Sequence, residues 1–378
     1  MKTARSVLFF LFAILLFTDI ARCQSNAFVI SSYPSSSKSY YDIDGNIVVW
    51  QDNRNKIPDQ WNRLTWDIYG YDLITKQEFA ICTQQNNQTF PAISGNYVIW
   101  RDERTRGSGI EDSIYGYNLS TSTEFAIQTG TSSGRPAING NLVAWSDSQY
   151  NIDDFGSSIF AHDLASSQTY LVHSAIVEGM YVMYNGFPAI SGNVIAWDRS
   201  PSSQHSPPTE TNSRIWVANI VTGSQFPVCP DPGGWEQKFP AVDGNIVVWW
   251  HSLNPTWQRR GICGYDLLTD TEFFISGISA INAGYCHPDI SGNLVVWEEN
   301  DSTIGHGSYR IYGYDLLNQY QFLITESEGA LGAPRISGNT VIWVGPDNVL
   351  YGTNIPEPAT MGILAAGLLI LSAKKSRK

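Results

Sequence analysis

The sequence of 378 residues lacks the local motifs that identify common enzyme active sites. It contains no HExxH zinc motif and no phosphate-binding loop. Its histidines are scattered and no two share a metal-binding spacing: His162, His173, His205, His251, His287 and His306. These absences predict no catalytic residues, no metal site and no cofactor, and they favour a protein that is not an enzyme.

Positive charge is also scarce. The chain has 23 Lys and Arg against 35 Asp and Glu, which gives a formal net charge of −12. A nucleic-acid-binding protein needs a basic surface, and so does a protein that binds anionic membranes. The charge therefore argues against both partners and favours a soluble, exported domain.

Cysteine is rare and has no metal-binding pattern. Apart from Cys23, four cysteines remain, and none belongs to a CxxC pair: Cys82, Cys229, Cys263 and Cys286. An oxidising compartment would permit disulfides, but the sequence leaves the pairing open.

One motif recurs seven times. A Gly-Asn pair is followed by a tryptophan five positions after the glycine, with glycine spacings of 45 to 52 residues. The tryptophans are Trp50, Trp100, Trp145, Trp197, Trp249, Trp297 and Trp343. A fixed motif at this period indicates repeated supersecondary units that pack on one another, with the tryptophans buried between them.

Each unit has the pattern of four short strands. In the second unit these are 91–93, 97–100, 113–119 and 124–127, all rich in Val, Ile, Tyr, Phe and Trp. The Asp-Gly and Asn-Gly pairs are strong hairpin turns, and the Ser-Gly pairs of the other units are weaker ones. Four-stranded units at this period predict an all-β fold, a seven-bladed β-propeller.

The last unit has no fourth strand of its own. Residues 27–30 resemble the fourth strands at 78–81 and 124–127, and their phenylalanines lie 17, 16 and 15 residues before the next repeat glycine. If they pair with the last unit, they close the ring and leave no open edge. Six blades with an open remnant is the alternative.

The N-terminal segment Met1–Cys23 has the pattern of a secretory signal peptide. Lys2 and Arg5 precede an apolar stretch, 7–17, which is too short to span a bilayer. Cleavage after Cys23 is expected, and a lipid-bearing Cys23 is the alternative.

The C-terminal segment 356–378 resembles the PEP-CTERM sorting signal of bacteria that have exosortases. Pro356, Glu357 and Pro358 are followed by an apolar run, 361–373, and a basic end, 374–378. The resemblance implies an exosortase-type processing enzyme as a partner and a transient anchor in the inner membrane of a Gram-negative bacterium. It further implies delivery to the cell surface or the exopolysaccharide matrix. A plain membrane anchor is the alternative. Without the two terminal segments, the propeller of residues 24–355 has 16 basic and 33 acidic residues, a net charge of −17.

Loop lengths predict two different faces. The first and third turns of every unit are short and constant, whereas the second turns and the connections between units vary in length. In an up-and-down blade the variable loops share one face, around one mouth of the channel, where binding is most often found. Five tryptophans fall in or beside them: Trp61, Trp66, Trp235, Trp250 and Trp257.

These loops supply the candidate binding residues. Aromatic rings beside polar groups suit stacking on sugars, and we expect Trp61, Trp66, Trp235 and Trp257 to do so. Arg259 and Arg260 would bind polar or anionic groups. The alternative is that the rings pack back onto the protein as satellite clusters.

Two acid–base pairs follow second strands, Asp52 with Arg54 and Asp102 with Arg104. They predict local ion pairs that order the start of each loop.

The repeat resembles those of TolB-like propellers from surface proteins. The best match, Gly-Asn-x-Val-Val-Trp-x-Asp-x-Arg followed by Asp-Ile-Tyr-x-Tyr-Asp-Leu, lies in 45–75 and 95–121. This resemblance implies the fold and does not imply one activity.

The expected function is a non-catalytic binding or structural role toward polysaccharide or surface proteins. The alternative is a carbohydrate-active lyase or hydrolase whose site lies at the variable-loop mouth of the channel.

Overall fold

A computed structural model describes residues 21–22, 27–33, 36–55, 64–105, 112–131, 134–151, 154–174, 176–177, 181–201, 212–228, 236–252, 260–278, 286–301 and 308–356. Every regular element in these ranges is a β-strand. The same residues contain no helix of the length and hydropathy that crossing a membrane would require.

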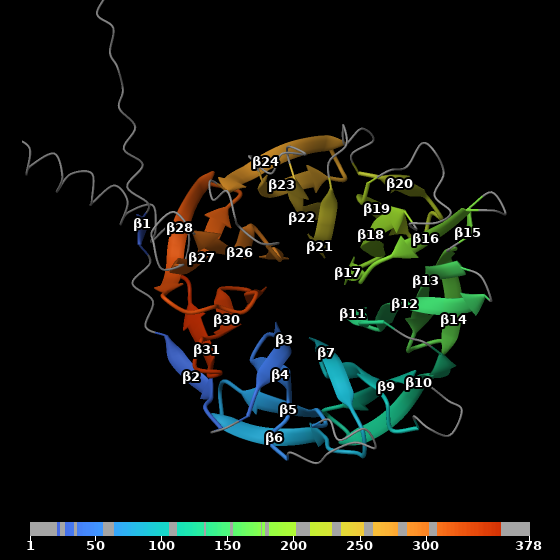
Figure 1. The fold of residues 1–378 in the computed structure, drawn as a ribbon, viewed down its shortest axis with the longest axis horizontal. Coiled ribbons are helices and arrows are strands. Elements are labelled where there is room, and N and C mark those ends of the chain that lie inside the picture. The colour runs from blue at the N-terminus through green and yellow to red at the C-terminus, as the bar shows by residue number, and fades with distance from the viewer. Residues whose placement is uncertain are drawn as a thin grey trace, which may run out of the picture.

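The strands form seven separate antiparallel sheets arranged as blades around a channel (Figure 1). The chain is a seven-bladed β-propeller, as the repeat predicts. Blades 1 and 2 contain β3 (Lys38–Asp44), β4 (Ile47–Asp52), β5 (Asp67–Asp72), β6 (Gln77–Cys82), β7 (Gln88–Ser94), β8 (Tyr97–Asp102), β9 (Asp112–Asn118) and β10 (Thr123–Thr131). Blades 3 and 4 contain β11 (Ala137–Asn139), β12 (Leu142–Asn151), β13 (Asp154–Asp163), β14 (Gln168–His173), β17 (Ala189–Ser191), β18 (Val194–Pro201), β19 (Arg214–Asn219) and β20 (Gln225–Pro227).

The remaining strands complete the ring. Blades 5 and 6 contain β21 (Gln237–Asp243), β22 (Ile246–Ser252), β23 (Arg260–Asp266), β24 (Thr271–Ile278), β25 (Asp289–Ser291), β26 (Leu294–Asp301), β27 (Ser308–Asp315) and β28 (Tyr320–Ser327). Blade 7 contains β29 (Arg335–Ser337), β30 (Thr340–Val344), β31 (Leu350–Asn354) and β2 (Phe28–Ser31). Two short strands, β15 (Ile176–Val177) and β16 (Tyr181–Asn185), extend blade 4, and β1 (Ala21–Arg22) pairs in parallel with β28.

The N-terminal strand closes the ring. β2 pairs antiparallel with β31, with Phe28 opposite Gly352. A methyl group added at Gly352 would lie 2.7 Å from the Phe28 ring, and the same close contact joins Gly116 to Phe125 in blade 2. Phe28 therefore occupies the position of a fourth-strand phenylalanine, and the seven-bladed prediction is confirmed over the open six-bladed one.

The seven repeat tryptophans lie between neighbouring blades. Each is at most 3 % exposed, which confirms their predicted place in the core. Trp145, for example, packs with Ile99 and Ile114 of blade 2 and stacks on Phe160 of its own blade, with ring centroids 5.9 Å apart. The core is therefore a ring of inter-blade clusters, because no single sheet can bury its own apolar faces.

The residue before each repeat glycine has a role beyond its turn. Its side chain accepts a hydrogen bond from the glycine N–H of the next blade, and this contact recurs around the whole ring. The pairs are Asp44–Gly95, Ser94–Gly140, Asn139–Gly192, Ser191–Gly244, Asp243–Gly292, Ser291–Gly338 and Ser337–Gly45. Serine suits this acceptor position, so the Ser-Gly turns are not merely weaker versions of Asp-Gly.

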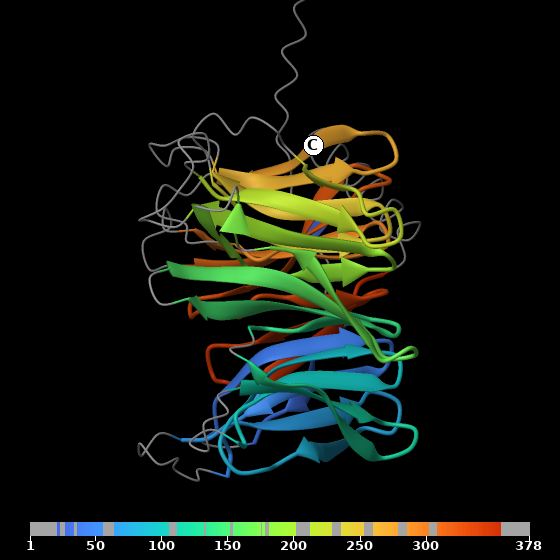
Figure 2. The ribbon, with the colours of Figure 1, turned by 90° about the vertical axis from the view of Figure 1, so that its right-hand side faces the viewer.

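The constant turns lie on one face of the ring and the strand ends that enter the variable loops lie on the other (Figure 2). All seven repeat glycines have positive φ, between 53° and 57°, as the tight first turn requires. The prediction of one constant and one variable face therefore agrees with the strand order.

Most of the two terminal signals lies outside the described residues. Residues 1–20 and 23 of the N-terminal segment and Glu357 and Pro358 of the sorting signal are not described. Pro356 is half-buried and follows Ile355, which is 2 % exposed and packs on blade 7. Signal cleavage and sorting both stay predictions.

Candidate active site at the mouth of the central channel

The first strands of all seven blades line a cavity of about 270 Å³ in the centre of the ring. Each strand contributes the residues that lead up to its Gly-Asn turn. In most blades these residues have the sequence X-Pro-Ala-Ile-Ser or a close variant. The residue five positions before the repeat glycine lies within or just before the first strand, and this position carries the aromatic rings, Arg135 and His287.

Aromatic rings gather at this position. Tyr40 and Phe90 meet edge to face with centroids 4.4 Å apart, and Phe90 lies 6.2 Å from Phe187. On the other side of the mouth, Phe239 lies 4.3 Å from the His287 ring. Tyr40 and Phe187 each keep 47 % of their surface exposed. Exposed rings around a concave site are suited to stacking on the apolar faces of sugars.

Three of these aromatic residues have a strained backbone. Tyr40, Phe90 and Phe239 have φ values of 44°, 57° and 57°, although bulky residues disfavour positive φ. Each sits at a register shift in its first strand, where an extra residue forms a β-bulge. Bulges re-aim side chains, and local strain concentrates at functional sites. The same device in three blades therefore marks this mouth as a candidate site.

Charged groups lie deeper in the cavity. Arg335 of β29 lies 3.9 Å from Asp289 of β25 across the blade boundary. Asp289 also accepts from the Ile336 N–H at 2.9 Å, and Asp42 of β3 accepts from the Ile93 N–H at 3.0 Å. Both carboxylates are thus tied to the backbone of the following blade.

Burial shifts the proton affinity of these groups. It raises the pKa of Asp42 to about 6, while the Arg335 charge acts in the opposite direction. Burial also raises the pKa of Asp289, and it raises that of the cavity residue Asp198 to about 6. Burial alone would lower the pKa of Arg335, but Asp289 and Asp42 more than offset it.

Arg135 is the second cation of the cavity. Burial and the charge of Arg335 lower its pKa to about 10, so it stays protonated at neutral pH. Its guanidinium carbon lies 5.9 Å from the Tyr40 ring centroid. Below about pH 6 Asp42 and Asp198 become neutral while both arginines remain charged, so the cavity gains positive charge and favours an anionic ligand.

His287 combines with Glu298 at the mouth. Its Nδ1 lies 2.6 Å from Glu298 Oε1, and its backbone N–H donates to both oxygens of the same carboxylate. A carboxylate on one ring nitrogen fixes the tautomer and the orientation of an imidazole. The other nitrogen, Nε2, is then set for proton transfer, in a side chain that keeps 40 % of its surface exposed.

Trp66 and Arg260 are the sequence-predicted binding residues that the structure describes, and neither is among the residues that line this cavity. Trp61, Trp235, Trp257 and Arg259 lie outside the described residues. Trp66 is half-buried between blades 1 and 2. Its backbone N–H donates to Asn87 Oδ1, and its backbone carbonyl accepts from the Gln88 N–H. Arg260 begins β23, half-buried, with its guanidinium 5.9 Å from the Trp250 ring.

Trp250 is fully buried on β22 in the core between blades 5 and 6, so it belongs to the inter-blade core and not to a variable loop. Sequence reasoning missed the cavity residues because it looked for function in the loops. A signal was present: the residue before each first-strand proline is aromatic or charged in Phe90, Arg135, Phe187, Phe239 and His287.

No family model and no curated protein matches the sequence. Among solved structures, an oligogalacturonate lyase in complex with manganese is 13 % identical, with a TM-score of 0.63 over 89 % of this chain and 95 % of that one. The oligogalacturonate lyase of Vibrio parahaemolyticus is 10 % identical, with a TM-score of 0.65 over 89 % and 96 % of the two chains. An acylaminoacyl peptidase of Pyrococcus horikoshii is 10 % identical, with a TM-score of 0.58, and the match covers 82 % of this chain and 48 % of that one.

At these identities the likeness establishes the fold. The β-propeller part of the TolB-like resemblance is confirmed by the seven blades. The expectation of a non-catalytic protein is contradicted, because the two oligogalacturonate lyases, which match this chain along almost their whole length, are enzymes.

The described cavity residues do not suit manganese. Hard divalent ions prefer several carboxylate, carbonyl and imidazole ligands that converge on one point. Asp42 and Asp289 are held by backbone N–H groups and by Arg335, and within the described ranges no three potential ligands converge on the cavity. We therefore derive no step of the proposed reaction through a metal ion.

Proposed function

We propose that this protein is a carbohydrate-active enzyme, a lyase that cleaves an acidic oligosaccharide or polysaccharide at the variable-loop mouth of the channel. The observation that carries the proposal is the grouping of Arg135, Arg335 and the Glu298-oriented His287 beneath a mouth of strained aromatic residues. The likeness of the whole chain to oligogalacturonate lyases supports the same class.

A uronate lyase must neutralise the sugar carboxylate, remove the proton on the adjacent carbon and let the glycosidic oxygen leave. Arg135 would bind the carboxylate, since guanidinium groups bind carboxylates in a bidentate manner. Neutralising that charge makes the neighbouring carbon more acidic. His287 Nε2 would then take the proton as general base, with Glu298 stabilising the imidazolium that forms. The electron pair of the C–H bond forms the new C=C bond as the glycosidic C–O bond breaks, and the departing oxygen takes a proton from water.

The aromatic mouth would hold the sugar rings. Tyr40 and Phe187 offer exposed ring faces on opposite sides of Phe90. The loop tryptophans Trp61, Trp66, Trp235 and Trp257, with Arg259 and Arg260, would extend this surface toward a longer chain. Polysaccharide is thus the proposed partner.

A hydrolase would need two carboxylic groups free to act on the glycosidic bond. Asp42, with its pKa near 6, is the acid that favours this alternative. Its oxygen is engaged by the Ile93 N–H, however, so we assign it to the wall of the site.

We also propose that the protein is exported. The signal-peptide pattern of Met1–Cys23 supports export, and the Pro356–Pro358 signal supports processing by an exosortase-type enzyme and display at the surface or in the matrix.

The test is incubation of the purified protein with polygalacturonate, alginate and other acidic glycans. Lyase action creates an unsaturated uronate, which is followed by its ultraviolet absorbance, whereas hydrolysis releases reducing ends without that absorbance. His287→Ala should lower kcat about 10²- to 10⁴-fold, as expected for a general base. Arg135→Gln should raise KM about tenfold or more.

His162→Ala is the matched control. His162 lies on β13, bonds to Thr169 and does not line the cavity, so its loss should leave turnover unchanged. Absence of turnover on every acidic glycan, or full activity of His287→Ala, would contradict the proposal.

A further inference from the structure

Blades 1 and 2 each contain a cluster of one arginine and two carboxylates, which begins where the second strand enters its variable loop. In blade 2, Arg104 lies 2.7 Å from Asp102 and 2.6 Å from Glu124, so one cation joins two carboxylates. Its guanidinium carbon lies 4.0 Å from the Tyr115 ring centroid. The Trp100 indole N–H also donates to Asp102, at 2.8 Å.

Blade 1 repeats the arrangement with Arg54. This residue pairs with Asp52 at 2.7 Å, contacts Glu78 and lies 3.9 Å from the Tyr69 ring centroid. The ion pairs predicted from the sequence are therefore confirmed, and each includes a fourth-strand glutamate. In both blades a cation fills the space between an acid on the second strand, a ring on the third and an acid on the fourth.

Blade 5 places three different residues at these positions. His251 follows the repeat tryptophan by two residues, as Asp52 and Asp102 do. Cys263 takes the place of the third-strand tyrosine, and Glu272 precedes the fourth-strand phenylalanine as Glu78 and Glu124 do. The position of Arg54 and Arg104 is occupied in the sequence by Leu253. The glutamate is kept while the cation-bearing residue is lost, and the acid and the ring become an imidazole and a thiol.

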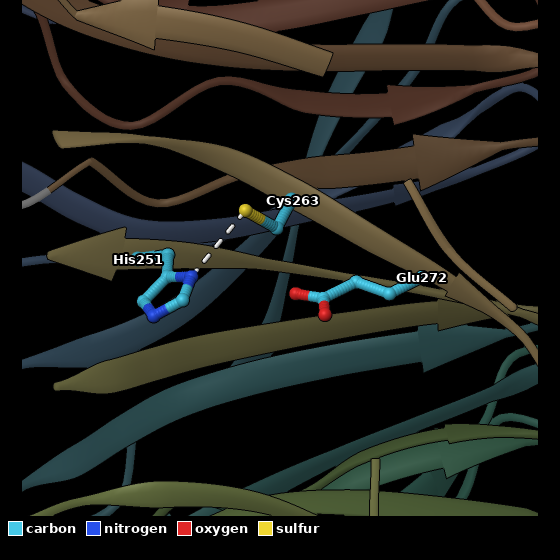
Figure 3. Close-up of side chains that lie close together, drawn as sticks. All are labelled: His251, Cys263 and Glu272. Atoms are coloured by element: carbon cyan, nitrogen blue, oxygen red, sulfur yellow. Dashed lines mark hydrogen bonds between the residues drawn. The ribbon is translucent and has the colours of Figure 1, made fainter. Parts of the chain in front are cut away.

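The three ligand atoms converge in space (Figure 3). His251 Nδ1 and Cys263 Sγ are 3.5 Å apart, and one atom from each of the three side chains lies within 4.8 Å of the others. In a tetrahedral zinc site, Zn–S of about 2.3 Å and Zn–N of about 2.0–2.1 Å separate the two ligand atoms by roughly 3.6 Å. The histidine and cysteine are thus already at the separation that zinc requires.

We propose that His251, Cys263 and Glu272 bind a zinc ion, which replaces in blade 5 the arginine cation of blades 1 and 2. Thiolate and imidazole together select zinc over calcium or magnesium. Binding displaces the thiol proton to solvent, and the thiolate and the carboxylate balance the 2+ charge. Two ligands are buried and Glu272 is exposed, so the ion has an entry path and a water can complete the tetrahedron.

The site lies between blades 4 and 5 and away from the central cavity. Cys263 packs with Val217 and Val228 in the cluster between these blades, and none of the three ligands lines the cavity. The ion would therefore hold the strands of blade 5 together, a role that does not depend on the proposed enzymatic activity.

The sequence alone did not reveal this group. Its members are separated along the chain and fit no metal motif, and strand pairing brings them to one face of the sheet. Trp249 is opposite Cys263, and Tyr265 is opposite Glu272, so the three ligands sit on diagonal positions of adjacent strands.

The experiment is zinc titration of the purified full-length chain, prepared under reducing conditions through a tag without histidine and freed of metal by chelation. Calorimetry should give one high-affinity zinc ion per chain. Zinc should also raise the melting temperature, because it binds the folded state. Cobalt added in place of zinc should produce the charge-transfer absorption of a cobalt–thiolate bond.

Cys263→Ser and His251→Ala should each weaken zinc binding at least about tenfold and abolish or change the cobalt spectrum. Cys82→Ser is the matched control, since Cys82 is likewise a buried cysteine outside any described disulfide. This variant should keep the zinc affinity and the cobalt spectrum of the parent chain. If a single variant fails to fold, the triple variant His251→Asp, Cys263→Tyr and Leu253→Arg rebuilds the cluster of blades 1 and 2. It should fold and bind no zinc.

Two results would overturn the proposal. One is a wild-type chain that takes up no zinc at micromolar concentration. The other is zinc binding that persists unchanged in Cys263→Ser or in the triple variant.

Discussion

Replacing Trp145 with alanine tests the inter-blade core most directly. Trp145 is 1 % exposed and lies between blades 2 and 3, where it packs with Ala92, Ile138 and Val143. Within the described residues its indole N–H has no hydrogen-bond acceptor. The alanine variant therefore loses apolar contact and leaves a cavity, without removing a polar interaction.

The expected loss is about 3–5 kcal/mol of unfolding free energy, the range for a buried aromatic residue replaced by alanine. This is a large share of the roughly 5–15 kcal/mol that stabilises a typical domain. Trp145→Phe keeps most of the apolar surface and should cost less. Trp100→Phe should cost about 1 kcal/mol more than Trp145→Phe, because it removes the N–H that donates to the buried Asp102 at 2.8 Å.

Urea denaturation followed by circular dichroism measures all three variants against the parent chain, with equal m-values as the control for unchanged two-state behaviour. A Trp145→Ala variant within about 1 kcal/mol of the parent would refute the reading of the repeat tryptophan as core. Equal costs for the two phenylalanine variants would refute the role given to the Asp102 hydrogen bond.

Three further predictions follow from the ring, the cavity and the chain end. Deleting residues 26–32 removes β2 and exposes the edge of β31. Light scattering should therefore detect aggregation, and the melting temperature should fall. An unchanged melting temperature and solubility would disprove closure by this strand. Burial raises the folded pKa of Asp42 to about 6, above its ordinary value near 4, so its contribution to stability is full below about pH 4 and is lost as the pH rises through 6. Asp42→Asn should flatten the dependence of unfolding free energy on pH between about pH 4 and 6. A dependence identical to the parent's would show that another group titrates in this range. Mass spectrometry of protein released from the native host should find a chain that ends near Pro356, whereas an intact Lys378 would indicate a plain membrane anchor.

The fold could be predicted from the sequence because its signals are local. A Gly-Asn turn and a tryptophan five positions later recur in every unit, and the first three strands of each blade follow one another in the chain. Even the long-range pairing that closes the ring, β2 with β31, left a local trace, since Phe28 has the phase of a fourth-strand phenylalanine.

The cavity could not be predicted in the same way. Asp42 and Arg335 lie near opposite ends of the propeller sequence, yet closure of the ring brings blades 7 and 1 together and lines one cavity with both. The loops drew attention because their tryptophans are conspicuous. The described cavity is lined instead by first-strand residues. Their only signal in the sequence was the residue before the first-strand proline, which is aromatic or charged and differs from blade to blade.

The three proposed zinc ligands, all in blade 5, likewise could not be predicted from the sequence. His251, Cys263 and Glu272 each look unremarkable in the sequence, and only the register of β22, β23 and β24 places them on one face. The sequence by itself determined the blade count, the buried tryptophans and the closing strand, because these depend on short-range periodicity. Only the tertiary structure decided which side chains meet, since ring closure and strand register set distances between residues that the chain order keeps apart.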